Sequence, residues 1–214
     1  EQGYSHELLD FVRMNASQKN PEWTNDQKIR IASEIINRRS ILIQKTDYVS
    51  SMMTDQLGWD HVRSKVLLPD GRPKSIIRDL DGFVGVNGDL LDFDVNAISN
   101  QAGASTLALS RDGFMIIVQQ NDINLQSPNL LAPSGSGSFD WSDYETIESK
   151  NLTNLVNYGA NRELREECNL GNGISVQSIV KTIGFVKMLH RCGKPEFLCI
   201  GIIDDLAINI INRQ

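Results

Sequence analysis

The sequence predicts a mixed α/β (α+β) protein, because strand-like runs and one long helix alternate in its C-terminal half. Two runs rich in apolar and β-branched residues, 105–110 and 114–120, flank a turn-like segment, which predicts a β-hairpin. Apolar residues at helical spacing then predict a helix over residues 151–168. Two more strand-like runs follow, at 174–189 and 197–203. This alternation indicates a sheet covered by helices.

Composition sets the broad class. The chain has 214 residues, enough for one large domain or two small ones, and its 40% apolar and 22% charged residues are typical of globular proteins. A formal charge of -6 argues against a general nucleic-acid binder but leaves room for a local basic pocket. No apolar run is long enough to span a bilayer, and the first residues do not resemble a signal peptide. Cys168, Cys192 and Cys199 lack CxxC spacing, which favours reduced thiols in a cytoplasmic protein.

The first hundred residues begin with a predicted helix. Thr24 and Gln27 have the spacing of a capping box, and apolar residues recur at helical spacing after them, at Ile29, Ala32, Ile35 and Ile36. These signals predict a helix over residues 25–39. A short strand is expected at 41–43 and a further helical segment around 60–64.

A β-hairpin is expected next. Residues 69–73, with two prolines and a glycine, predict a turn. The strand-like runs 75–86 and 89–93 are separated by Asn87-Gly88, a sequence that favours a two-residue hairpin turn.

The small, polar segment 96–103 is the predicted domain boundary. Residues 1–100 would then form an accessory region of a helix and a β-hairpin, and residues 101–214 a core domain. The accessory region has no motif that carries chemistry. It could cover a substrate, form a homodimer interface or complete the sheet.

Within the core domain, the run 114–118 is expected to be central in the sheet, and Arg111-Asp112-Gly113 to form the turn before it. The short apolar run 130–132 leads into 133–138, which reads as a small-residue loop. The long helix is expected to end at the glycines of 171–173.

Three glutamates near the end of this helix form the main candidate site. At about 100° per residue, Glu163, Glu166 and Glu167 fall in one sector of the helix. That sector continues an apolar stripe formed by Leu152, Leu155, Val156 and Gly159. Burying like charges is costly unless cations compensate, which predicts a divalent metal held by carboxylates. The alternative is a solvated surface on which Arg162 and Glu166 form an exposed pair.

The same residues resemble the signature of the Nudix hydrolase superfamily, Arg-Glu-U-x-Glu-Glu-x-Gly-U, where U is a bulky aliphatic residue. The residues that match it in register are Arg162, Glu163, Leu164, Glu166, Glu167 and Leu170, and Pro133-Ser134-Gly135 resembles the Pro-Gly-Gly that opens the family motif. The resemblance covers residues 104–203.

The match has departures. The family has a further glutamate eight residues before the arginine of this signature, and that position is Asn154 here. Asn169 stands where the signature has its glycine, although asparagine can adopt left-handed backbone angles. The segment from Gly135 to Arg162 is longer than in the family, which indicates an insertion. The chain after Ile203 is short for the last strand and closing helix of that fold, which leads us to expect a core that is incomplete at this end.

The resemblance implies a mixed sheet flanked by helices and an enzyme that hydrolyses the pyrophosphate bond of a nucleoside diphosphate linked to another group. Mg²⁺ or Mn²⁺ would bind Glu163, Glu166 and Glu167, and Arg162 would be mainly structural, paired with a helix carboxylate. Substrate, and a metal through a backbone carbonyl, would contact the loop formed by Ser134, Gly135, Ser136 and Gly137. Magnesium supplies charge neutralisation and an activated water in such a reaction.

The general base, or an extra metal ligand, is left open among three carboxylates late in the chain: Glu196, Asp204 and Asp205. Carboxylates of the insertion could also reach the site and replace the glutamate absent at Asn154; these are Asp140, Asp143, Glu145 and Glu148.

Two other functions remain: a nucleotide-binding or regulatory module without catalysis, and a purely structural or interaction protein. Asp92-x-Asp94-x-Asn96 begins like a calcium loop, but Ala97 and Gly103 occupy positions that such a loop reserves for glycine and glutamate. These departures exclude a calcium-binding loop at this motif.

Overall fold

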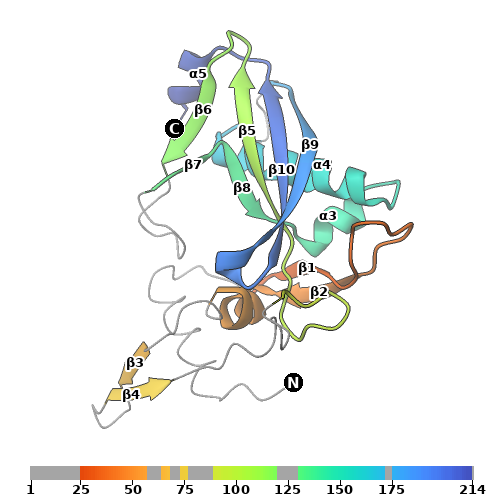
Figure 1. Cartoon of the computed structure of the whole chain (residues 1–214). Coiled ribbons are helices and arrows are strands. Elements are labelled where there is room, and N and C mark those ends of the chain that lie inside the picture. Colours follow the sequence, from red (N-terminus) through yellow and green to blue (C-terminus); the bar gives the residue numbers. More distant parts are fainter. Residues whose placement is uncertain are drawn as a thin grey trace. The chain divides into compact units, whose positions relative to one another are not determined.

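The computed structural model describes residues 25–56, 89–119, 130–171 and 175–213, and the backbone of two short strands at 64–67 and 73–76. The described elements make a mixed α/β structure with a mixed β-sheet and few helices (Figure 1). The chain divides into two compact units. Unit 1 is Glu1–Gln101 with Met188–Lys194, and unit 2 is Ala102–Lys187 with Pro195–Gln214.

Unit 2 is built around a six-stranded sheet. Its strand order is β7 (Leu131–Pro133), β6 (Met115–Gln119), β5 (Gly103–Ser110), β10 (Lys194–Ile203) and β9 (Ser178–Met188), with β8 (Gly135–Ser138) also paired to β5. Strand β5 runs parallel to β10 and antiparallel to β6 and β8, so the sheet is mixed. The predicted hairpin between β5 and β6 is confirmed. Its turn uses Gly113, whose φ of 83° suits glycine and whose N–H donates to the Ser110 carbonyl.

One face of this sheet is buried beneath helix α4 (Leu152–Glu167), which lies behind the sheet in Figure 1. Ala104, Thr106 and Ala108 of β5 are fully buried on that face. A methyl group on Gly201 of β10 would come within 2.9 Å of the Leu164 side chain, which shows how closely α4 approaches. Strand β6 is interior in the strand order, as expected, but its side chains alternate between exposed and buried, so only one of its faces is covered.

The predicted long helix is confirmed as α4. Asn151 caps its start by accepting the Asn154 N–H at 2.9 Å. The helix ends earlier than the glycines of 171–173, because Asn169 adopts φ 50° and reverses the chain. The Leu170 N–H then donates to the Arg165 carbonyl at 2.7 Å. Asparagine thus supplies the left-handed conformation that glycine usually provides at a helix C-terminus.

Gly135 sets how closely α4 packs on strand β8. A Cβ at this position would lie 2.5 Å from Leu164 Cα and 2.7 Å from Leu164 N, atoms of the helix backbone that cannot turn aside. We expect Gly135→Ala to lower the free energy of unfolding by about 2–3 kcal/mol through overpacking. Urea denaturation measures this loss. Gly171→Ala is the matched control, since a Cβ there meets nothing within 4 Å; equal midpoints for the two variants would contradict the packing argument.

The remaining strands of unit 2 differ from prediction mainly at their ends. The run expected over 174–189 is β9, which continues through Gly184 without the break considered there. A single 3-10 turn, Leu189–Arg191, follows it, and then Cys192 at φ 54° and Gly193 at φ 81° reverse the chain. Strand β10 therefore begins at Lys194 rather than at residue 197.

In unit 1, the helix predicted over residues 25–39 is not formed. Residues of that segment form β1 (Gln27–Ile31), which pairs antiparallel with β2 (Ile43–Asp47). Ile29 and Ile31 are buried and alternate with more accessible neighbours, a period of two rather than 3.6. Ile36, counted as part of the helical stripe, is 67% exposed. The strand expected at 41–43 begins only at its last residue.

The predicted hairpin of residues 75–93 is described only at its ends. Residues 77–88 lie outside the described part, and the expected strand 89–93 is absent: Leu90 makes one isolated bridge and a turn starts at Phe93. Two other short strands, β3 (Ser64–Leu67) and β4 (Pro73–Ile76), pair antiparallel.

The predicted turn 69–73 falls between β3 and β4, and its residues 69–72 are outside the described part. So are residues 60–63 of the predicted helical segment, whose last residue begins β3.

Three short α-helices, α2 (Tyr48–Ser51), α3 (Trp141–Thr146) and α5 (Ala207–Ile211), and a π-helical turn, Met52–Gln56, complete the described elements. Among the helices of the described segments, none has the length and apolar character needed to cross a membrane.

Candidate functional site

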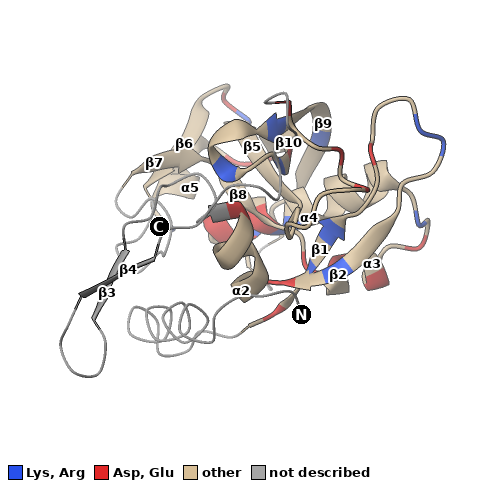
Figure 2. Ribbon diagram, turned by 60° about the horizontal axis from the view of Figure 1, so that its bottom comes forward, with Lys and Arg blue, Asp and Glu red and all other residues tan. Residues whose placement is uncertain are grey.

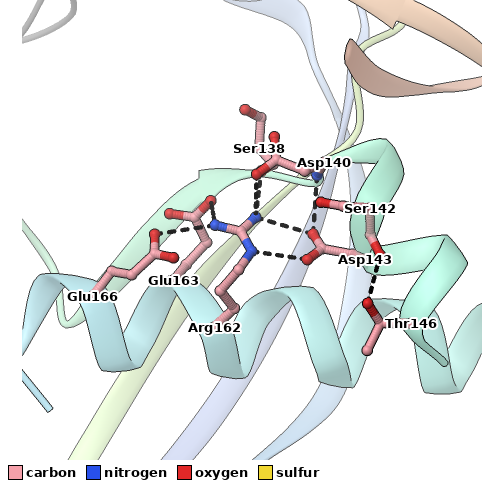
Figure 3. A network of polar contacts seen from close by, with 8 residues as sticks. All are labelled: Ser138, Asp140, Ser142, Asp143, Thr146, Arg162, Glu163 and Glu166. Carbon is pink, nitrogen blue, oxygen red and sulfur yellow. Dashed lines mark hydrogen bonds and ion pairs between the residues drawn. The ribbon is translucent and has the colours of Figure 1, made fainter. Parts of the chain in front are cut away.

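Arg162 is the centre of a group of acidic side chains, which we call the carboxylate network (Figure 3). Glu163 and Glu166 come from the same helix, α4. Asp140 immediately precedes α3, and Asp143 lies on it. Helix α3 falls within the predicted insertion, so the insertion does reach the candidate site.

The guanidinium of Arg162 holds all four carboxylates. Its Nε and Nη2 donate to the two oxygens of Asp143 at 2.8 and 3.0 Å. Its Nη1 lies 3.0 Å from Glu163 Oε1 and 3.1 Å from Glu166 Oε2, and Nη2 lies 3.2 Å from Asp140 Oδ2. Nη2 also donates to the Ser138 carbonyl at 3.1 Å. The two-pronged contact with Asp143 is the geometry that arginine favours with carboxylates.

Local structure places Asp143 for this contact. The Asp140 N–H donates to Asp143 Oδ2 at 2.9 Å, so the start of α3 helps to hold this carboxylate in position for Arg162. Gly159 on α4 lets the two helices approach, because a Cβ there would lie 2.5 Å from the Phe139 ring and 3.1 Å from Asp143 Oδ2. Asp143 is 1% exposed as a result.

Negative charge exceeds positive charge in the network. Burial by itself lowers the pKa of Arg162, but the hydrogen bonds that it donates to Asp143 and the charges of Glu163, Asp143 and Asp140 outweigh this effect and hold the pKa above its usual value. Glu167, next along the helix, has a raised pKa because it is partly buried and lies near Glu166. Figure 2 shows the acidic residues of α3 and α4 in red.

Gly137 makes room for Glu163. A Cβ on Gly137 would lie 2.1 Å from Glu163 Oε2, so the carboxylate rests directly on the β8 backbone. Only glycine allows this contact without displacing Glu163. The sequence placed Gly137 near the site but not in this role.

The segment predicted as a substrate-binding loop is not a loop. Residues from Gly135 to Ser138 form β8, and the ladder with β5 pairs Gly137 with Ala104 and Ser136 with Ser105. Ser134 is fully buried; its Oγ donates to the Ile116 carbonyl at 2.6 Å and accepts the Ala108 N–H at 2.7 Å. Pairing with β5 and close packing against α4 place this small-residue run in a strand. Its part in substrate binding stays a prediction.

The three predicted metal ligands differ in exposure. The Glu163 side chain is 13% exposed, and that of Glu166 is 60% exposed; Glu167 is intermediate. They do not bring three ligand oxygens within 4.8 Å of one another. Within the described part of the chain, the group that does so is Glu34, Asp92 and Asp94 of unit 1.

The sequence analysis did not predict this second acidic group. Its aspartates belong to the motif excluded as a calcium loop, and Glu34 lay in the wrongly predicted helix. Asp94 binds Arg38 at 3.2 Å, and Glu34 accepts the Phe93 N–H at 2.9 Å. Arg38 thus balances one of the three acidic charges.

The candidate general bases lie at opposite ends of β10. Glu196 pairs with Gly103, which in turn pairs with Ser138 beside Arg162, so its backbone is at the network's end of the sheet. Its side chain, however, accepts from Ser105 Oγ at 2.7 Å on the face opposite α4.

Asp204 and Asp205 follow the far end of the same strand, on the order of 20 Å away at about 3.3 Å per residue. Asp205 accepts from Asn209 and Arg213, which lowers its pKa to about 2. The topology therefore separates both aspartates from the network.

The rest of the predicted site residues lie outside the network. Glu145 and Glu148 of the insertion are exposed. Asn154 is exposed in the first turn of α4, where its N–H is capped and its Nδ2 donates to the Ser149 carbonyl at 3.4 Å. The three cysteines are free and buried.

Comparison of the chain with models of known protein families and with curated proteins found no match in either.

Proposed function

We propose that the glutamate face of α4 binds a divalent cation and that this chain is a Nudix-type hydrolase of nucleoside diphosphates linked to another group. The observation that carries the proposal is the charge imbalance at Arg162, where one guanidinium binds four carboxylates and Glu167 adds a fifth beside them. Crowded, partly buried carboxylates favour an additional cation.

The donor set suits magnesium or manganese, since it consists of carboxylate oxygens alone. Glu163, Glu166 and Glu167 would hold the ion, which when bound neutralises charge on diphosphate oxygens and activates a water. Arg162 fixes Glu163 and Glu166 through its Nη1 and is itself fixed by Asp143 on the opposite side. Gly137 keeps the Glu163 carboxylate against β8, so the first ligand has a defined position.

Glu167→Gln tests the proposal, because the amide keeps the shape of the side chain and removes its charge. We expect at least a 10- to 100-fold loss of Mn²⁺ affinity, the loss that is typical when even a group that only supports the metal ligands is changed. Metal titration calorimetry measures the affinity. Chromatography of the products from a panel of dinucleotides and nucleotide sugars measures Mg²⁺-dependent hydrolysis, which should fall at least in proportion.

Glu145→Gln is the matched control, since Glu145 is an exposed carboxylate on α3 outside the network. Equal effects of the two substitutions would sink the proposal. So would a wild-type chain that binds neither Mg²⁺ nor Mn²⁺ at millimolar concentration.

A nucleotide-binding or regulatory module without catalysis is the second candidate. Asn154 lacks a carboxylate, and the three glutamates do not converge within 4.8 Å. Binding of nucleotide by the wild type, with no turnover of any compound in the panel, would favour this function over hydrolysis.

A further inference from the structure

The sheet face opposite α4 is apolar and accessible. We call it the apolar sheet face. It consists of side chains that are 37–76% exposed: Leu109, Met115, Ile117, Leu131, Ile179, Ile183, Leu198, Ile200 and Ile202. All of them belong to unit 2. In Figure 1 this face is turned toward the reader, with α4 behind it.

Strand register makes these side chains neighbours. Leu109 pairs with Met115 of β6 on one side and with Ile202 of β10 on the other, so the three form one apolar row across the sheet. Leu107 pairs with Ile200 in the next row. Residues directly opposite each other in a ladder point to the same face, so the rows form one continuous patch.

Charge is absent from most of this surface. Strands β5, β6 and β7 contain no Lys, Arg, Asp or Glu, and Figure 2 draws them in tan. Lys181 of β9 is exposed on the patch itself, because it lies between the patch residues Ile179 and Ile183 on the same side of the strand, and the Glu196 carboxylate lies at one end of β10. The part of the patch formed by β5, β6 and β7 therefore has no like-charge repulsion to oppose the approach of an identical surface.

The size of the patch suits a dimer. Half-exposed aliphatic side chains of this number offer on the order of 500 Å² of apolar surface. A patch of this extent is near the upper end of what a typical monomer exposes, and patches of that size are often functional. A standard interface covers about 800 Å² per partner, of which about 65% is apolar in homodimers, and that product is again close to 500 Å².

We propose that the apolar sheet face binds the same face of a second copy of this chain. Two sheets pack face to face with interdigitating aliphatic side chains, as in β-sandwiches. A two-fold axis through the patch would bury the same residues on both copies and close the assembly at a dimer. The proposal is independent of the metal site on the other side of the sheet.

The test is the mass of the full chain in solution, by light scattering and sedimentation over a dilution series. We expect a species of twice 23.9 kDa. Ile200→Glu, near the middle of the patch, should weaken dimerisation on the order of 100-fold, since a charge would be desolvated there. Circular dichroism checks that the variant folds. Ile200→Thr, which keeps a β-branched side chain, provides a milder variant and should weaken the dimer less.

Ile36→Glu is the matched control, because Ile36 is 67% exposed in unit 1, outside the patch. It should leave the dimer intact. A wild-type chain that is monomeric at every concentration overturns the proposal, whether another part of the chain or a different protein covers the face. A dimer that survives Ile200→Glu also overturns it.

Discussion

Arg162→Ala is expected to lower the free energy of unfolding by about 3–5 kcal/mol, the cost of leaving a buried charge without its partner. Asp143 is 1% exposed and receives both arms of the guanidinium, so the substitution strands a carboxylate that water does not reach. Asp140, Glu163 and Glu166 lose the same cation and repel one another. The Ser138 carbonyl loses a donor as well.

Urea denaturation followed by circular dichroism measures this loss. Arg111→Ala is the control: Arg111 pairs with Asp204 at 3.8 Å with both side chains more than half exposed, so its loss should cost less than about 1 kcal/mol. A double-mutant cycle with Asp143→Ala isolates the pair, and removing both partners should cost less than the sum of the single changes. A loss for Arg162→Ala no greater than that for Arg111→Ala would refute the central role of Arg162.

Asp55→Ala in unit 1 is the second large effect. Asp55 is fully buried on the π-helical turn Met52–Gln56. It accepts from Ser51 Oγ at 3.0 Å and from the backbone N–H groups of Asn100 and Gln101, each at 3.1 Å. Removing the carboxylate leaves these donors buried without their hydrogen-bond acceptor. This change is expected to lower the free energy of unfolding by about 3–5 kcal/mol.

The cost should depend on pH. Burial raises the pKa of Asp55 to about 6, against the lowering effects of Gln101, Ser51, Lys194 and Asn100. The folded state therefore binds more protons than the unfolded state between about pH 4 and 6, so this residue stabilises the fold most at low pH and less as the pH rises through 6. The loss on Asp55→Ala should thus be larger at pH 4.5 than at pH 7.5, by about 2 kcal/mol.

Urea midpoints of both chains at the two pH values give the difference. Asp94→Ala serves as a control, because Asp94 is 39% exposed at its side chain and pairs with Arg38 on the surface. The opposite order of the losses, with the greater one at pH 7.5, would contradict a raised pKa at Asp55.

Prediction from sequence succeeded where a local pattern and the tertiary environment agree. The hairpin around Gly113 and the helix capped by Asn151 carry their own turn and cap residues, and both formed as expected. The helix prediction for residues 25–39 was wrong because the spacing of the isoleucines in this segment fits both the helical period of 3.6 and the strand period of two. Pairing with β2, a contact between residues distant in the chain, selected the strand.

In the candidate site too, some features follow from local sequence and others depend on tertiary contacts. The proximity of Glu163, Glu166 and Glu167 follows from helix geometry, so the sequence alone determines it. Their relation to Asp143 does not, because the insertion must fold back as α3 before its carboxylate reaches Arg162. No spacing rule links residues from two helices joined by a connection of arbitrary length.

The glycines show the limit most clearly. Within 133–138 the sequence indicated only a run of small residues, and small residues are typical of loops. The structure uses Gly135 to admit the α4 backbone and Gly137 to admit the Glu163 carboxylate, within a strand paired to β5. Sequence determined the helix and its acidic face. The tertiary structure decided what lies against that face, because close packing depends on atoms brought together only when the chain folds.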